Sequence, residues 1–176
     1  MIRISDLACR LRTEIRTIRL IAKENEIPIT VLPDARDQEG KMRIEYIDSN
    51  EILKITALIW LRAKYEIKLI LINLAKQICS KTISYDDLAA LVHAIHFDAH
   101  DSKLNDMLRE ISIEEYQAGR GLLSALVVHQ EENYKPAADF FRLDNKIGED
   151  GQGMDKDNFW HRHLNKVRAH WRFNQP

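Results

Sequence analysis

The chain has 176 residues, enough for one ordinary domain with a sizeable core or for two small ones. Hydrophobic residues make up 45% of it and charged residues 30%, which is typical of a globular protein and excludes a disordered or fibrous one. The formal net charge of -1 argues against a protein that coats nucleic acid indiscriminately.

The small net charge hides a concentration of basic residues at the N-terminus. Residues 1–23 contain only two acidic side chains, Asp6 and Glu14. The cations of the same stretch are Arg3, Arg10, Arg12, Arg16, Arg19 and Lys23. We therefore expect any contact with an anionic partner at this end of the chain.

The cysteine content and the apolar segments indicate a cytoplasmic protein. Cys9 and Cys79 lie far apart in apolar settings, which predicts buried free thiols and neither a disulfide nor a zinc site. The N-terminus has no uninterrupted apolar stretch of the kind found in a signal peptide. Residues 52–78 are very apolar but are interrupted by charged residues, among them Lys54, Arg62, Lys64, Glu66 and Lys68, so they lack the roughly 18 uncharged residues of a membrane span.

The first 50 residues predict two helices followed by a β-hairpin. Ser5 or Asp6 is expected to cap a short helix over 6–11, and a second helix follows at about 13–25. Residues 27–33 are extended between two prolines, and residues 42–47 alternate as a strand does, so the two make a hairpin with a long tip. The tip is acidic, with Asp34, Asp37 and Glu39.

A long helix is predicted next, from Asn50 to about Cys79. Residues 48–50 supply its caps, and it is apolar nearly all round, which indicates a buried central helix or one paired with another subunit. These elements divide the chain into a winged-helix-like unit at 1–50, a connecting or dimerisation helix at 51–80, and a small α-rich unit at 81–176. The expected fold class is mainly α (α+β).

The last unit is predicted to combine helices with one short strand. A helix over 87–95 is capped by Ser84 or Asp86, and another over 101–112 by Asp101 or Ser102. The apolar run 122–129 is expected to be a strand. A helix over 136–147 and a final amphipathic helix over 158–173 complete the unit, with a flexible loop between them.

The second helix carries the pattern that suggests DNA binding. When residues 12–23 are placed on one helix, Arg12, Arg16, Arg19 and Lys23 fall within a stripe about 60° wide. Arginine at such a position can read guanine in the major groove, and other cations, including Arg43 on the hairpin, can contact phosphate. The alternative is an ordinary solvated face, partly neutralised by Glu14 and Glu24.

The same region resembles the MerR-type regulators and the related excisionase-like DNA-binding domains. The resemblance covers about 60 residues and rests on Leu7-Ala8, on Thr17-Ile18-Arg19 nine residues after the alanine, and on the cadence of "MRIEYIDSNEILKI". It implies a recognition helix that includes Thr17, and a dimer organised by the long helix. Arg12 stands where the family has its turn glycine, so a continuous helix through this position remains the alternative to a turn.

The second half of the chain resembles a widespread bacterial and phage-associated family with no assigned activity. The shared pattern is the Gly-Arg-x-Leu-Leu-Ser-Ala-Leu-Val-Val run from Gly119, a helix with paired phenylalanines and a terminal aromatic helix. Arg120 is a candidate ligand-binding or catalytic cation, together with His129. The alternative is an ion pair between Arg120 and Glu114 or Glu115.

No metal or cofactor site is predicted. His93, His96 and His100 have a spacing that zinc can use, but on a helix they would lie about 120° from its apolar face, towards water. The leading hypothesis is thus a regulator-like protein that binds double-stranded DNA as a homodimer. A protein–protein adaptor with a degenerate winged helix is the alternative, and an enzyme with a site near Arg120 is a weaker one.

Overall fold

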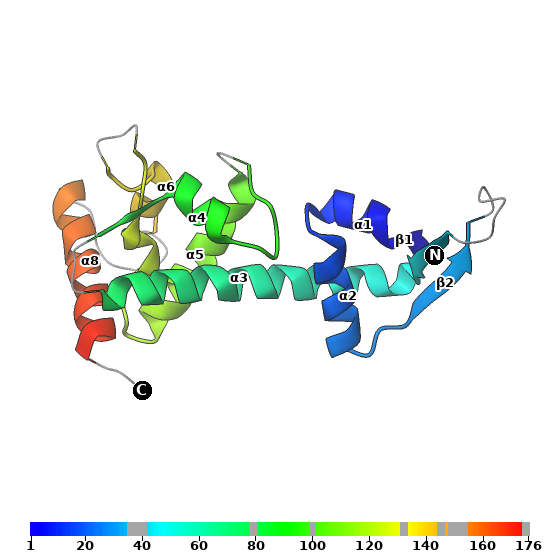
Figure 1. Cartoon of the computed structure of the whole chain (residues 1–176). Coiled ribbons are helices and arrows are strands. Elements are labelled where there is room, and N and C mark those ends of the chain that lie inside the picture. Colours follow the sequence, from blue (N-terminus) through cyan, green and yellow to red (C-terminus); the bar gives the residue numbers. More distant parts are fainter. Residues whose placement is uncertain are drawn as a thin grey trace. The chain divides into compact units, whose positions relative to one another are not determined.

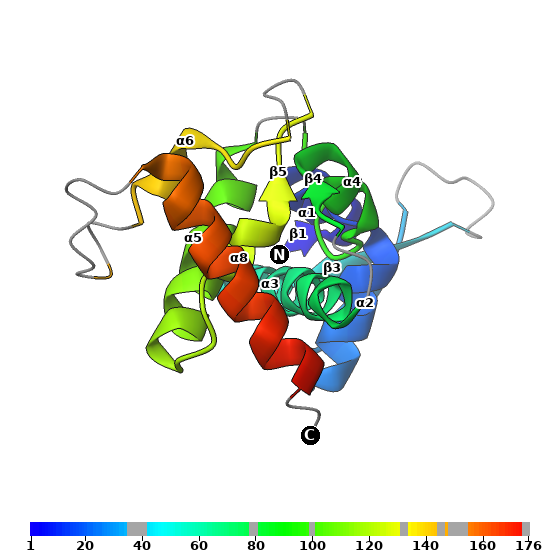
Figure 2. The ribbon, with the colours of Figure 1, turned by 90° about the vertical axis from the view of Figure 1, so that its left-hand side faces the viewer.

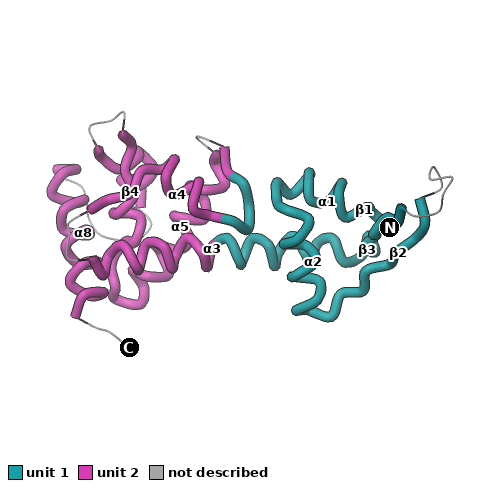
Figure 3. The backbone as a smooth tube through the Cα atoms, in the orientation of Figure 1, with its two compact units in different colours: residues 1–63, 93–96 teal, residues 64–92, 97–176 magenta. Residues whose placement is uncertain are grey.

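The computed structural model describes residues 1–34, 42–77, 81–98, 101–130, 134–143, 147 and 155–173. Over these residues the protein is mainly helical with small sheets, which confirms the mainly α (α+β) fold class (Figure 1). The chain forms two compact units (Figure 3): unit 1 is Met1–Ala63 with His93–His96, and unit 2 is Lys64–Val92 with Phe97–Pro176. None of the described helices is both long enough and apolar enough to cross a membrane.

Unit 1 begins with a strand that the sequence pattern does not predict. β1 (Ile2–Arg3) pairs with β3 (Arg43–Ile47), and α1 (Ile4–Leu11) follows without a gap. Ser5 and Asp6 therefore lie inside the first turn of α1 and do not cap it. Cys9 is exposed on this helix, so the expectation of a buried thiol is wrong there, and Cys79 lies outside the described residues.

The second helix and the hairpin are present as predicted. α2 (Ile15–Glu24) buries Ile18, Ile21 and Ala22, and its opposite side is exposed. β2 (Ile29–Pro33) and β3 pair antiparallel, with Ile29 opposite Ile47 and Pro33 opposite Arg43. The sheet order is β1-β3-β2, so the hairpin is extended by the N-terminal strand.

A short 3₁₀ turn and a long helix follow the hairpin. The Asp48 carboxylate accepts the Asn50 N–H at 2.9 Å at the start of η1 (Ser49–Glu51), as the predicted cap requires. α3 (Ile52–Lys76) then contributes its first half to unit 1 and its second half to unit 2. Most of its buried residues recur four positions apart, as on one helical face: Ile55, Ile59, Ala63, Ile67, Leu71 and Ala75. Ile72, next to Leu71, is also buried.

Unit 2 contains two further helices with the predicted caps. The Ser84 hydroxyl accepts the Asp87 N–H at 3.0 Å at the start of α4 (Tyr85–Leu91). The Asp101 carboxylate accepts the Lys103 N–H at 3.0 Å at the start of α5 (Ser102–Gln117), which is longer than expected. α4 ends four residues earlier than predicted, because the chain turns extended at Val92.

The apolar run 122–129 is only partly a strand. η2 (Leu123–Leu126) is a 3₁₀ helix, and only β5 (Val127–Val128) is extended, paired parallel with β4 (Ile83–Ser84). Figure 2 shows these two strands side by side. The Ser124 N–H donates to the Ser112 hydroxyl at 3.0 Å. At Ser124 the backbone N–H is therefore bonded to a side chain of α5 and not to a neighbouring strand. Burial on all sides leaves no alternation from which the 3₁₀ turn could be predicted.

The C-terminal elements close the core of unit 2. α6 (Ala138–Phe141) is shorter than the predicted helix over 136–147, and residues 144–146 of that range lie outside the described part. α8 (Lys156–Phe173) buries Phe159, Leu164 and Val167. The Trp160 indole N–H donates to the Ala125 carbonyl at 2.8 Å, which joins α8 to η2.

Candidate nucleic-acid interface

The chain turns at Arg12, between α1 and α2. Arg12 has φ 51° and ψ 46°, the left-handed conformation that glycine adopts most readily. Its N–H donates to the Cys9 carbonyl at 3.2 Å, and that of Thr13 donates to the Ala8 carbonyl at 3.0 Å, which satisfies the end of α1. The continuous helix is therefore wrong, and Arg12 lies in the turn instead of on the α2 surface.

A distant segment of the chain supports this turn. The buried Thr13 hydroxyl donates to the Ala94 carbonyl at 2.6 Å, and the His96 N–H donates to the Arg12 carbonyl at 2.7 Å. Both acceptors are backbone carbonyls and one donor is a backbone N–H, so Thr13 is the residue whose side chain takes part in these two bonds. Residues 93–96 thus add two hydrogen bonds to the turn between α1 and α2.

The exposed side of α2 presents three cations, here called the α2 cationic face: Arg16, Arg19 and Lys23. At about 100° per residue, these side chains lie opposite the buried Ile18, Ile21 and Ala22. The side chains of Arg16 and Arg19 are 76% and 55% exposed. Leu20 is exposed beside them, and Thr17 is half-buried at the edge.

The hairpin contributes a carboxylate and a cation to the same region. The Arg19 guanidinium donates from Nε to Oε2 of Glu45 on β3 at 2.8 Å. Arg19, Glu45 and Arg43 line one open hollow of about 460 Å³, whose apolar wall includes Ile15 and Val31. The structure therefore brings Arg19 and Arg43 together, although 24 positions separate them in the sequence.

The acidic residues near the α2 cationic face differ in their partners and in their burial. Glu14 forms an ion pair with Arg16, whereas Glu24 pairs with Arg62 of α3 at 3.4 Å. Asp34, at the base of the hairpin tip, is buried, and its N–H donates to the Met42 carbonyl at 2.9 Å. The rest of the predicted acidic tip lies outside the described residues.

The two candidates of the second half lie in unit 2 and not with the cations of unit 1. The Arg120 guanidinium donates to both carboxylate oxygens of Glu115 at 2.6 and 2.8 Å, and Lys68 contacts the same carboxylate at 2.6 Å. Burial alone would raise the pKa of Glu115, but the hydrogen bonds and charges of Arg120 and Lys68 outweigh it and lower the pKa. The ion-pair alternative for Arg120 is the observed one, with Glu115 as the partner.

The remaining histidines are not arranged as the helical spacing suggested. α4 ends at Leu91, so His93 and His96 lie in the irregular segment that supports the Arg12 turn. His100 lies outside the described residues. His129 stacks on Tyr85 with ring centroids 4.3 Å apart. Among the residues that the structure describes, no cluster of three His, Cys, Asp or Glu side chains is placed to hold a metal ion.

No family model, curated protein or solved structure matches this chain. Any function proposed for it therefore rests on its own residues and their arrangement.

Proposed function

We propose that unit 1 is a winged-helix DNA-binding unit of the MerR-like kind, in a cytoplasmic regulator that acts on double-stranded DNA. The observation that carries this proposal is the α2 cationic face. Its cations are exposed on a helix whose other side is buried in the core, and Arg43 of the hairpin lines the same hollow as Arg19. A helix held in this way can enter the major groove while the hairpin follows the adjacent backbone.

Residue roles follow from position on this face. Arg16, Arg19 and Lys23 would contact base edges and phosphates, and the exposed Leu20 offers an apolar contact of the kind that thymine methyl groups accept. Arg43, the first residue of β3, would contact phosphate. Arg12 is not part of this face, because it belongs to the turn.

The test is salt-dependent binding to duplex DNA. We expect the full chain to bind a random-sequence duplex at low salt in a fluorescence anisotropy titration, with affinity falling linearly on a logarithmic salt scale. Arg16→Ala and Lys23→Ala should each weaken binding and reduce the salt slope by about one. Lys54→Ala removes an exposed cation of α3 instead and serves as the matched control.

Absence of binding at low salt, or equal weakening by the α2 variants and by Lys54→Ala, would exclude DNA as the partner. A protein–protein adaptor is then the second candidate. It is favoured by Glu14 and Glu45, which pair with Arg16 and Arg19 inside unit 1 and reduce the field available to phosphate.

We further propose that the protein acts as a homodimer through α3. The helix exposes large apolar side chains that recur at multiples of four residues, with Leu61 62% and Tyr65 61% exposed. Such a stripe on a long helix suits a second copy of the same helix, and a two-fold dimer would present two α2 cationic faces to two half-sites. Sedimentation equilibrium tests this: Leu61→Glu should yield a monomer, and a monomeric wild-type chain would exclude the dimer.

A further inference from the structure

Two stretches of unit 2 contain cations and no acidic side chain. Residues 67–85 and 158–176 include no aspartate or glutamate, although the whole chain has 27 acidic residues. The first stretch covers the end of α3 and all of β4, and the second covers all but the first two residues of α8. Their cations are Lys68, Lys76, Lys81, Arg162, Lys166, Arg168 and Arg172. Both stretches are therefore positively charged within a chain that is nearly neutral overall.

Hydrogen bonds join the two stretches where α3 ends, and Figure 1 shows the last turns of α8 beside this end. The Arg172 guanidinium donates from Nε and Nη2 to the Gln77 carbonyl at 3.2 and 2.9 Å. Arg168 donates from Nη2 to the Lys81 carbonyl at 3.3 Å. Lys76 directly precedes Gln77 in the chain. Four cations thus gather at this end of α3, here called the α3–α8 cationic cluster: Lys76, Lys81, Arg168 and Arg172.

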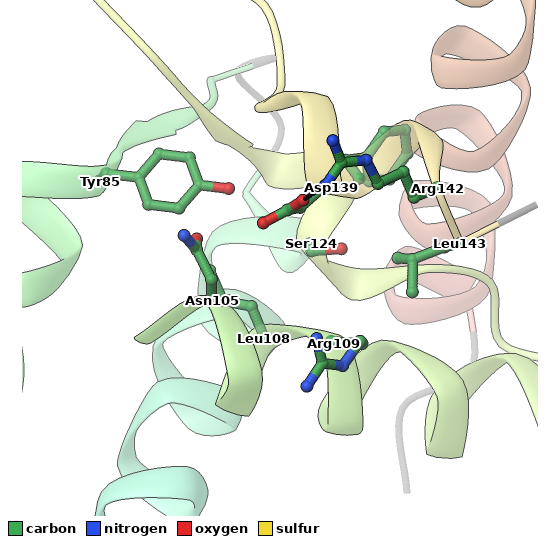
Figure 4. A pocket seen from close by; sticks show the side chains of 9 residues that line it. Tyr85, Asn105, Leu108, Arg109, Ser124, Asp139, Arg142 and Leu143 are labelled. Carbon is green, nitrogen blue, oxygen red and sulfur yellow. Dashed lines mark hydrogen bonds and ion pairs between the residues drawn. The ribbon is translucent and has the colours of Figure 1, made fainter. Parts of the chain in front are cut away.

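Arg168 differs from other arginines of unit 2 in having no carboxylate partner among the described residues. Arg109, which lines the hollow of about 130 Å³ shown in Figure 4, pairs with Asp106. Arg142 of the same hollow pairs with Asp139 at 2.8 Å. The bond from Arg168 to a carbonyl oxygen leaves its positive charge uncompensated, because that oxygen carries no net charge.

The cluster holds like charges close together and within reach of solvent. Burial lowers the pKa of the Arg168 guanidinium, and the neighbouring charge of Arg172 lowers it further. Arginine stays protonated at neutral pH, so the repulsion persists until an anion offsets it. Lys76 and Lys81 form no ion pair with any described residue. Lys81 is exposed and the other three side chains are half-buried, so a ligand can reach all four.

The surroundings of the cluster favour a nucleic-acid backbone over a lipid surface. A helix that lies on a membrane inserts its apolar face, but α8 buries Phe159, Leu164 and Val167 inside unit 2. Arg168 and Arg172 are one turn apart, about 6 Å along the helix. Because the phosphates of one strand follow one another every 3.4 Å or so of duplex axis, a single strand can supply a partner for each arginine.

We propose that the α3–α8 cationic cluster is a second nucleic-acid contact, which binds the phosphate backbone of double-stranded DNA. The choice of DNA as the polyanion rests on the function proposed above for unit 1. Contacts to phosphate carry no sequence information, so the cluster adds affinity equally for every sequence. Reading of bases remains with the α2 cationic face.

The two lysines of the cluster allow a test that leaves the fold intact. Lys76→Gln and Lys81→Gln each remove a charge whose side chain has no hydrogen-bond partner among the described residues. In anisotropy titrations of the full chain with a random-sequence duplex, each should reduce the slope of log affinity against log salt by about 0.9. Lys81→Arg keeps the charge and should keep the slope. Lys103→Gln removes an exposed lysine of α5 and is the matched control, with the slope unchanged.

Combined variants separate the cluster from the α2 cationic face. In a chain that carries Arg16→Ala and Lys23→Ala, Lys81→Gln should still reduce the remaining slope by a similar amount, since the two surfaces share no residue. If the wild type binds DNA but the cluster variants behave as Lys103→Gln does, the cluster is not a DNA contact, and the proposal for unit 1 stands. If only the cluster variants weaken binding, the cluster is the DNA contact and the proposal for the α2 cationic face is wrong.

Lipid phosphate is tested with vesicles of phosphatidylcholine and phosphatidylglycerol in equal amounts. We expect the full chain to stay in the supernatant when these vesicles are sedimented at the same low salt. Co-sedimentation that Lys81→Gln abolishes, together with unchanged DNA binding by that variant, would identify a lipid surface as the partner and overturn the proposal.

Discussion

The Nε–H of Arg19 on the recognition-helix candidate donates to Glu45 of the hairpin at 2.8 Å, across 26 residues of sequence. The carboxylate thereby orients the guanidinium and also competes with any phosphate for it. Exposed pairs of this kind contribute about 0–1 kcal/mol to folding, so the influence of Glu45 on binding should exceed its influence on stability.

Glu45→Gln should therefore strengthen binding to random-sequence duplex DNA at low salt while changing the free energy of unfolding by less than about 0.5 kcal/mol. The reason is that Arg19 loses a competing anion but keeps a neutral hydrogen-bond acceptor. Anisotropy titration and urea denaturation measure the two quantities. Weaker binding in the variant would mean that Glu45 serves mainly to orient Arg19.

Replacing Arg12 with glycine should stabilise the protein. The left-handed backbone at Arg12 costs an L-residue about 1–2 kcal/mol, which glycine avoids, although glycine has more freedom to lose on folding. We expect a net gain of about 0.5–1 kcal/mol in urea denaturation. Arg10→Gly, inside α1, is the matched control and should lose about 1 kcal/mol.

The Glu115 cluster should be sensitive to both mutation and pH. Glu115→Gln leaves Lys68 and Arg120 beside a neutral amide, and we expect a loss of about 2–3 kcal/mol, since both cations can still reach water. The folded pKa of Glu115 is lowered, so its stabilising effect is present above its unfolded pKa and is lost as pH falls through the folded value.

The stability difference between the wild type and Glu115→Gln should accordingly shrink as the pH is lowered below the usual glutamate value of 4.5. Urea denaturation at several pH values measures this difference. A difference that stays constant down to strongly acidic pH would contradict the assignment of the lowered pKa to Glu115.

Thr13→Val should destabilise unit 1 by about 1–2 kcal/mol, because it leaves the Ala94 carbonyl without the Thr13 hydroxyl. Thr56→Val is the comparison: the Thr56 hydroxyl donates to the Ile52 carbonyl within α3 at 2.8 Å, so only a local bond is lost. Equal effects of the two variants in urea denaturation would argue against a special role for the Thr13 bond.

Local chemistry made much of the fold predictable. Asp48, Ser84 and Asp101 are caps whose hydrogen bonds reach only two or three residues ahead, so the sequence around them contains the information. The hairpin was also predictable from local sequence, because two prolines bound its first strand and residues 42–47 alternate as a strand does. The exposed cations of α2 were predicted from helical periodicity alone.

The missed features depend on distant partners. β1 is two residues long and exists through its pairing with β3, and α4 ends early where the next segment runs to the Arg12 turn. Helical periodicity could not distinguish a turn at Arg12 from a continuous helix through that position. Glu45 did carry a signal: it lies two positions after Arg43 in a strand, so both side chains point to the same face.

The bond from Thr13 to Ala94 has a consequence for how the protein is made. Unit 1 is discontinuous, since its last four residues follow 29 residues of unit 2 in the chain. A ribosome that has released only the first 63 residues has not yet supplied the carbonyl that Thr13 requires or the N–H that meets Arg12. The α1–α2 turn therefore receives its full set of hydrogen bonds only after residue 96 emerges, and a fragment cut at Ala63 would lack them permanently.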